Sequence, residues 1–182
     1  MKKILSSWSG MRKYLEQEMI ADSLRGKVRY NCTTFIGMDG CRFFELFVDG
    51  KSFKRFSWET VNSYFIAEGY VNKPKPMRIA DYWKDFWRVL EKYPMTERTE
   101  YTDDEFCAAL EEYRNSNIQE SIHSQNPIVK MFALFDRRIG KRTLEQIEEE
   151  VNAQPKWVQA LYQRRKESSF SAKISIPGRE KQ

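Results

Sequence analysis

The chain has 182 residues, of which 41% are hydrophobic, 14% aromatic and 31% charged. This length predicts one domain, or one domain with a small appendage, and the apolar content excludes a disordered chain. Lysine and arginine number 31 against 26 aspartates and glutamates, which leaves a net charge of +5. Such a charge permits nucleic acid or an acidic protein as a partner but requires neither.

The three cysteines, Cys32, Cys41 and Cys107, are an odd number without a C-x-x-C spacing. They therefore predict neither a disulfide framework nor a zinc site. The first ten residues lack the apolar run of a signal peptide, and no stretch approaches the roughly 20 apolar residues that span a bilayer. We expect a cytoplasmic protein with reduced thiols and no membrane partner.

The first half of the chain predicts a helix, three strands and a second helix. Apolar residues at helical spacing predict a first helix that is capped by Ser7 or Ser9 and ends near Leu24. Alternating β-branched and aromatic residues then predict strands over 27–36, 41–48 and 51–56. Met38-Asp39-Gly40 predicts the first turn. Asp49-Gly50 predicts a two-residue hairpin turn, because both positions of that turn need positive φ.

The second half predicts helices alone, after a break at the prolines of 73–76. Aromatic residues at helical spacing predict a helix over 79–93, and Thr102 with Glu105 forms a capping box. Asn126-Pro127 begins a helix with apolar residues at 128, 129, 132, 133 and 135, which is expected to end at Gly140. Two shorter helices are predicted over 143–151 and 155–166.

Together these elements predict an α+β fold: an N-terminal helix, a three-stranded antiparallel meander and a mostly helical C-terminal half. We expect an α-β-β-β-α segment at 1–72, a helical segment at 77–167 packed on it as one unit, and a disordered tail at 168–182. A three-stranded sheet has a face to cover, and the helical half, with its aromatic stripe at 79–93, is the expected cover.

Most catalytic patterns are missing from the sequence. His123 is the sole histidine, lies in a polar segment and has no nucleophile motif near it. The eight glycines form neither a dinucleotide-binding motif nor a P-loop. We therefore predict no cofactor, no metal and no catalytic residue, and we expect a protein that is not an enzyme.

An alternative is a metal-dependent hydrolase or nuclease that uses carboxylates near the sheet. Its candidates are Glu18 on the first helix with Glu45, Asp49 and Lys51 in the hairpin. Asp49-Gly50-Lys51 has the acid–x–lysine spacing of such enzymes. However, the hairpin turn alone is a sufficient reason for Asp-Gly at this place.

Four cations, Arg137, Arg138, Lys141 and Arg142, surround the helix end expected at Gly140. Cations there complement the helix dipole, which is a sufficient structural reason for them. The alternative is a surface that binds phosphates or an acidic partner.

The segment 144–166 matches a degenerate helix-turn-helix. With the turn at Asn152, five apolar residues fall at the buried positions of that motif: Ile147, Val151, Ala153, Val158 and Leu161. The second helix then presents Lys156, Gln159, Gln163, Arg164, Arg165 and Lys166 to phosphates or bases. Glu148 departs from the pattern, because a small residue is usual there.

Several blocks resemble an uncharacterised family of bacterial proteins found in enteric bacteria and Firmicutes. These blocks are Trp8-Ser9, Leu24-Arg25-Gly26-Lys27-Val28, Asn126-Pro127, Asp136-Arg137-Arg138-Ile139-Gly140-Lys141-Arg142 and Tyr162-Gln163-Arg164. The resemblance covers about residues 8–166, and it implies that the two halves belong to one folded unit. No activity, cofactor or catalytic residue is assigned to the family.

The function expected from the sequence is therefore binding without catalysis. The predicted contact surface for nucleic acid or an acidic partner consists of Arg137, Arg138, Lys141, Arg142, Lys156, Gln159, Arg164 and Arg165. The helix-turn-helix and the carboxylate enzyme are the alternatives.

Overall fold

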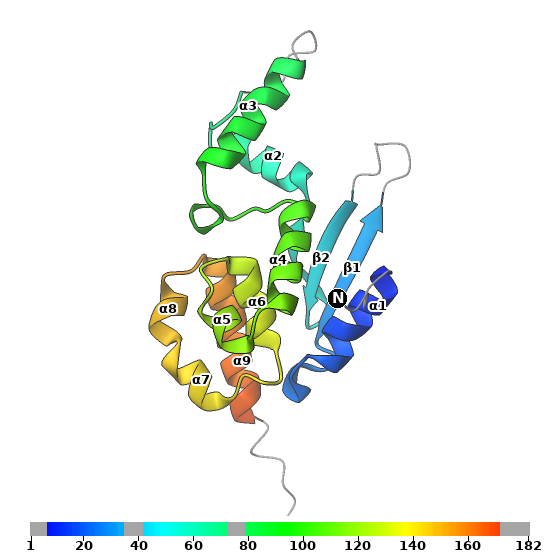
Figure 1. Cartoon of the computed structure of the whole chain (residues 1–182), viewed down its shortest axis with the longest axis vertical. Helices are drawn as coiled ribbons and strands as arrows, with labels where there is room; N and C mark the ends of the chain where they lie inside the picture. The colour runs from blue at the N-terminus through cyan, green and yellow to red at the C-terminus, as the bar shows by residue number, and fades with distance from the viewer. Residues whose placement is uncertain (1–6, 35–41, 73–78, 172–182) are drawn as a thin grey trace, which may run out of the picture.

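The computed structural model describes residues 7–34, 42–72 and 79–171. The described chain forms the predicted α+β fold: an N-terminal helix, a three-stranded sheet and a mostly helical C-terminal half (Figure 1). One pair of helices, α2 (Trp58–Ala67) and α3 (Ile79–Lys92), projects from the rest of the molecule (Figure 1).

The N-terminal helix is shorter than predicted. It consists of α1 (Trp8–Lys13) and a π-helical continuation (Tyr14–Glu18), and a separate 3-10 turn (Asp22–Leu24) follows. Two backbone hydrogen bonds to the end of another helix interrupt it. Ala21 N–H donates to the Phe135 carbonyl at 2.8 Å, and Arg137 N–H donates to the Met19 carbonyl at 2.7 Å. The predicted helix end near Leu24 was wrong because these distant partners replace the helical ones.

The sheet has the predicted meander order, with β1 (Val28–Thr34), β2 (Arg42–Val48) and β3 (Lys51–Phe56) antiparallel. Asp49 and Gly50 have φ values of 51° and 75°, which confirms the predicted hairpin turn. A bulge shifts the register, because Leu46 faces Lys54 while Phe47 faces Ser52. The turn predicted at 38–40 lies outside the described residues.

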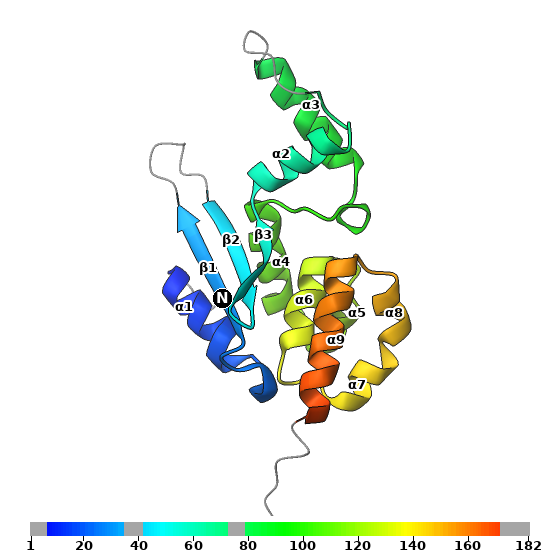
Figure 2. The ribbon, with the colours of Figure 1, turned by 180° about the vertical axis from the view of Figure 1, so that it is seen from behind.

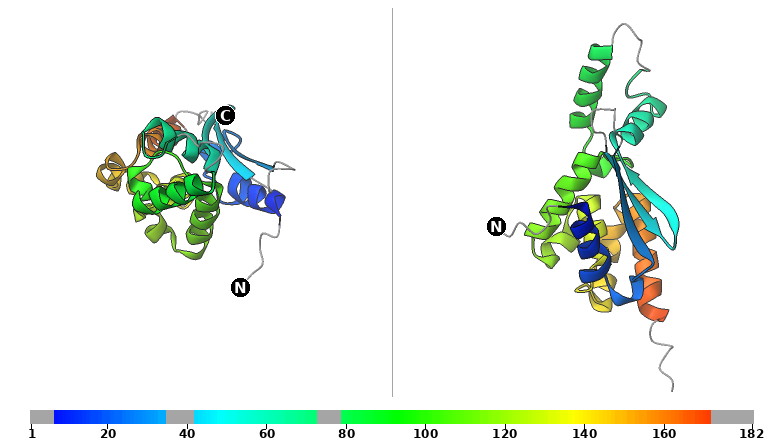
Figure 3. Two further views of the ribbon diagram at one scale, coloured as in Figure 1. Left: turned by 90° about the horizontal axis from the view of Figure 1, so that it is seen from above. Right: turned by 90° about the vertical axis from the view of Figure 1, so that its right-hand side faces the viewer.

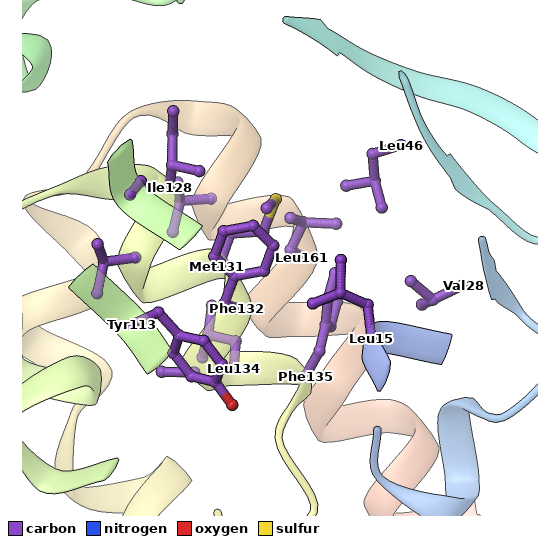
Figure 4. Packing of buried hydrophobic residues seen from close by; sticks show 14 of the residues in the cluster. Leu15, Val28, Leu46, Tyr113, Ile128, Met131, Phe132, Leu134, Phe135 and Leu161 are labelled. Carbon is purple, nitrogen blue, oxygen red and sulfur yellow. The ribbon is translucent and has the colours of Figure 1, made fainter. Parts of the chain in front are cut away.

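The inner face of the sheet packs on α6 (Pro127–Phe135), in which all nine residues are buried. A helix that is hydrophobic on every side is stable only in the interior, and the sequence of α6 is apolar except for Lys130. Figure 4 shows Phe132 and Met131 of α6 near the centre of the core, together with Leu161 of α9 (Lys156–Ser171) and with Leu46 and Val28 of the sheet. Helix α4 (Asp103–Asn115) covers the rest of this face, where Phe106 stacks on Phe44 with ring centroids 4.4 Å apart.

Helices α2 (Trp58–Ala67) and α3 (Ile79–Lys92) form a second, smaller core of their own. Phe65 and Phe86 are fully buried in it and lie 5.4 Å apart. The aromatic residues of α3 therefore pack on α2 and not on the sheet. The helical half covers the sheet as predicted, through α4 and α6, but the aromatic stripe is not part of that cover. Trp87, which belongs to the predicted stripe, is 50% exposed. The proline break at 73–76 lies outside the described residues.

The remaining helices begin mostly where predicted. The capping box of Thr102 and the Asn126-Pro127 start are confirmed. A further helix is α5 (Ile118–His123), and a 3-10 turn (Met95–Glu97) precedes α4. Helix α6 ends at Phe135 and not at Gly140, which instead precedes α7 (Lys141–Gln146). Helix α8 (Glu148–Asn152) follows, and α9 continues to Ser171, past the start of the tail predicted at 168.

Among the described residues, no helix combines the length and the apolar character that crossing a membrane requires. Cys32 and Cys107 are free cysteines.

Candidate functional site

The segment 136–142, called the knuckle below, is held from inside by Asp136. This carboxylate is fully buried and accepts hydrogen bonds from the backbone N–H of Arg138 at 2.7 Å and from its guanidinium at 2.6 Å. The hydroxyl of Tyr113 donates to the same carboxylate. The hydrogen bond to Asp136 raises the pKa of Arg138. Arg138 therefore has a structural partner, although half of its side chain is exposed.

The other cations of the knuckle face solvent. Arg137 and Arg142 are exposed, and their side chains have no partner among the described residues. Lys141 lies 3.9 Å from Glu145. Because Lys141 and Arg142 begin α7 and do not end a helix, the dipole explanation is wrong for them: positive charge at a helix N-terminus is unfavourable.

Arg165 does not belong to the predicted contact surface, because it is 5% exposed. Its guanidinium donates to the carbonyls of Leu134 at 3.0 Å and Ile139 at 2.9 Å, and to two serine hydroxyls. These carbonyls belong to the end of α6 and to the knuckle, where regular helical partners are missing. Arg165 thus joins α9 to the knuckle, and its inclusion among the binding residues is corrected.

Four other polar residues of α9 are engaged within the chain. Arg164 pairs with Asp49 at the hairpin turn, and Lys166 pairs with Glu148 at 2.9 Å. Lys156 donates to Gln159 at 3.3 Å, and the Gln159 amide donates to backbone carbonyls of 152 and 154. These side chains lie near the surface, but none is free in the way that the helix-turn-helix prediction requires.

The geometry of the predicted helix-turn-helix is also different. Asn152 is the last residue of α8, and Asp49 is the only non-glycine with positive φ in the described part of the chain. The left-handed turn expected at Asn152 is therefore not formed. Ile147, Val151, Val158 and Leu161 are buried as predicted, whereas Ala153 is exposed. A helical hairpin exists here, with a different turn.

The carboxylates considered for an enzyme have separate partners. Glu45 accepts a hydrogen bond from Ser52 at 2.6 Å and lies 3.6 Å from Arg55. Asp49 pairs with Arg164, while Glu18 is exposed beyond α1. In the described ranges, no three His, Cys, Asp or Glu side chains come together as metal ligands would. His123 is half-exposed, and its Nδ1 lies 2.8 Å from Glu150.

A groove between α1 and the edge of β1 was missed by the sequence analysis. It has a volume of about 690 Å³. Three exposed cations line it: Arg12 and Lys13 from α1, and Arg29 from β1. None of the three has a partner among the residues that the structure describes. Polar groups of Ser9, Gln17 and Asn31 and the ring of Phe47 complete the lining. We call this cavity the α1–sheet groove.

The one carboxylate in the α1–sheet groove already has a structural role. Glu16 accepts a hydrogen bond at 2.6 Å from the backbone N–H of Tyr30, on the free edge of β1. An unpaired strand edge needs such a partner, so Glu16 fixes α1 to the sheet. The charge left unpaired in the groove is therefore positive. Alternation along β1 could have indicated that Arg29 and Asn31 are exposed, but the position of α1 depends on tertiary contacts.

The SF0329 protein family matches residues 7–166, almost the same stretch as the sequence blocks described above. This match confirms the resemblance to a family of proteins of unknown function. Neither the curated proteins nor the solved structures contain a match to the chain.

Proposed function

The chain belongs to the SF0329 protein family, and we propose that it is a non-catalytic cytoplasmic protein that binds nucleic acid. In this proposal, the α1–sheet groove holds the phosphate backbone. The observation that carries it is the set of three exposed cations, Arg12, Lys13 and Arg29, around one cavity of about 690 Å³. Arginine and lysine around a groove are the side chains that contact phosphates most often.

The charge balance of the groove supports a phosphate ligand. Three cations face one carboxylate, and that carboxylate is engaged by the Tyr30 N–H. Amide and hydroxyl groups of Asn31, Gln17 and Ser9 add hydrogen-bonding capacity, which sugar and phosphate oxygens use. A negatively charged, extended polymer fits this lining better than an apolar ligand does.

The knuckle is proposed as a second phosphate contact, through Arg137 and Arg142. The hydrogen bond from Arg137 N–H to the Met19 carbonyl attaches the knuckle to the chain that follows α1. The knuckle and the α1–sheet groove are therefore joined to the same N-terminal segment. Lys141 and Arg138 remain nearby, whereas Arg165 is excluded because it is buried.

The test is fluorescence anisotropy with a labelled oligonucleotide between 50 and 200 mM salt. The logarithm of the binding constant is expected to fall with the logarithm of salt by about 0.7 per phosphate contacted on a single strand, or about 0.9 on duplex DNA. Changing Arg12, Lys13 and Arg29 together to alanine is expected to lower that slope by about 2 to 3.

The control variant carries Lys84, Arg88 and Lys92 changed to alanine. These exposed cations lie on α3, outside the groove, and their removal changes the net charge by the same amount. The control is expected to bind as the unchanged protein does. If both variants bind the oligonucleotide equally weakly, the lower net charge alone explains the loss of affinity. The absence of any binding at 50 mM salt would contradict the proposal and leave an acidic protein as the partner to test.

A further inference from the structure

The outer face of the sheet is not covered by any described helix. Figure 2 shows the three strands with no helix in front of them, and the side view in Figure 3 shows the helices packed on the opposite face. On an open face of an antiparallel sheet, the outward residues are usually polar. This face instead carries two phenylalanines, Phe43 and Phe47, both half-buried.

We infer that the nucleic acid is single-stranded and that its unpaired bases stack on the outer face of the sheet, at Phe47 and at the Arg55 guanidinium over Phe43. This inference rests on the proposed function. Unpaired bases stack on aromatic rings and on arginine planes, and sheet surfaces offer both side by side. The two phenylalanines alternate on β2 with the inward Phe44, Leu46 and Val48.

The rings lie on one strand and one face, four residues apart. At the usual rise of a strand, their attachment points are separated by about 13 Å. Phe47 also lines the α1–sheet groove, next to Arg29. A strand whose phosphates lie in the groove can therefore place a base on Phe47, and a later base can reach Phe43 along the same strand.

The neighbours of the two rings fit this use. The guanidinium of Arg55 lies over the Phe43 ring, 4.5 Å from its centroid, so a base at this position stacks on the guanidinium plane that covers the ring. Glu45, between the phenylalanines, is neutralised by Arg55 at 3.6 Å and by a hydrogen bond from Ser52. The bulge pairs Phe47 with the small Ser52, so a second bulky side chain does not lie opposite the ring.

A duplex cannot use these rings, because its bases are paired and stacked inside the helix. The inference therefore predicts a preference for single strands. The test compares a labelled 12-nucleotide poly(dT), a 12-base-pair duplex and a 12-mer of abasic sites at one salt concentration. The poly(dT) strand is expected to bind more tightly than the other two, by a factor of about 5 to 100 for each stacked base.

Variants at Phe47 identify the surface. Phe47→Thr keeps a residue that favours strands and is expected to weaken poly(dT) binding by about 5- to 100-fold, without changing the salt slope. Phe47→Trp keeps a stacking ring and is expected to retain the affinity. Trp87→Ala, which removes an exposed aromatic ring on α3, is the matched control and is expected to change nothing. A circular dichroism melt of each variant shows that it is folded.

The outcomes separate this inference from the proposed function. If the arginine and lysine substitutions in the groove weaken binding but Phe47→Thr does not, the stacking surface is overturned and nucleic-acid binding stands. Equal affinity for abasic and poly(dT) strands overturns the stacking surface in the same way. If no strand binds at low salt, both proposals fail.

Discussion

The helical half and the α1–sheet groove use their positive charge differently. In the helical half, Arg165 and Lys130 are almost completely buried, and Arg164 and Lys166 are paired within the chain. In the groove, Arg12 and Arg29 face solvent without a partner among the described residues. The sequence alone favours the first region as a binding surface, because its cations are close together along the chain. Pairing and burial, however, decide whether a cation is available to a ligand.

The buried cations of the helical half also differ from each other. Arg165 has hydrogen-bond acceptors for all of its guanidinium nitrogens. Lys130, in the centre of α6, has none among the residues that the structure describes: its Nζ lies 3.6 Å from the carboxylate of Glu150, too far for a hydrogen bond. Burial lowers the pKa of Lys130. The first cation is expected to stabilise the fold, and the second to reduce its stability.

The largest effect is expected for Arg165→Ala. The substitution leaves the carbonyls of Leu134 and Ile139 buried without donors, so we expect the free energy of unfolding to fall by about 3 to 5 kcal/mol. Urea denaturation followed by circular dichroism measures the change. The control is Arg164→Ala, which removes a half-exposed ion pair with Asp49 and is expected to cost at most about 1 kcal/mol. Equal losses in the two variants would contradict the assignment of Arg165 as a structural residue.

A smaller effect of opposite sign is expected for Lys130→Met. Replacing a buried, poorly paired charge by an apolar side chain of similar length is expected to raise the free energy of unfolding by about 1 to 3 kcal/mol at pH 7. Glu150 keeps a partner in this variant, because His123 lies 2.8 Å from it. A loss of stability in urea denaturation would show that the ammonium is well paired.

The pH dependence of the free energy of unfolding gives a second test of the role of Lys130. Its pKa is lowered in the folded chain, whereas the unfolded chain keeps a value of about 10.4. As the pH rises between these two values, the folded state loses the proton first, so the free energy of unfolding rises with pH. The advantage of Lys130→Met over the unchanged protein is therefore expected to shrink between pH 7 and pH 10. An advantage that does not change with pH would contradict the lowered pKa.

The smallest effect on stability is expected in the groove. The exposed side chains of Arg12, Lys13 and Arg29 make no ion pair with the described residues. The variant in which all three are changed to alanine is therefore expected to alter the free energy of unfolding by at most about 0.5 kcal/mol for each substitution. The same variant is the one expected to lose nucleic-acid binding. A large loss of stability would mean that these cations support the fold, as Arg165 does.

Local chemistry explains which elements could be predicted. The Asp49-Gly50 turn, the Thr102 capping box and the Asn126-Pro127 start depend on residues a few positions apart, and all three were predicted correctly. The end of the first helix depends on hydrogen bonds with residues 135 and 137, far along the chain. No local pattern contains that information.

The candidate binding residues divide in the same way: local pattern predicts some of them, and the others depend on contacts between distant segments. The sequence indicated an exposed knuckle, and Arg137 and Arg142 are exposed there. It also placed Arg165 on the surface, because the spacing of α9 does not show that the end of α6 needs donors on that side. The α1–sheet groove joins residues 9–17 with residues 29–50, and neither segment suggests a site on its own.

The sequence by itself determined the order of the elements, the hairpin turn, most helix starts and the buried character of α6, because backbone preferences and hydrophobic periodicity act over a few residues. Tertiary structure decided that α3 packs on α2, that Arg165 is interior and that a basic groove lies beside β1. These features depend on which distant groups meet, and burial changes the energy of a charged side chain by more than any local preference does.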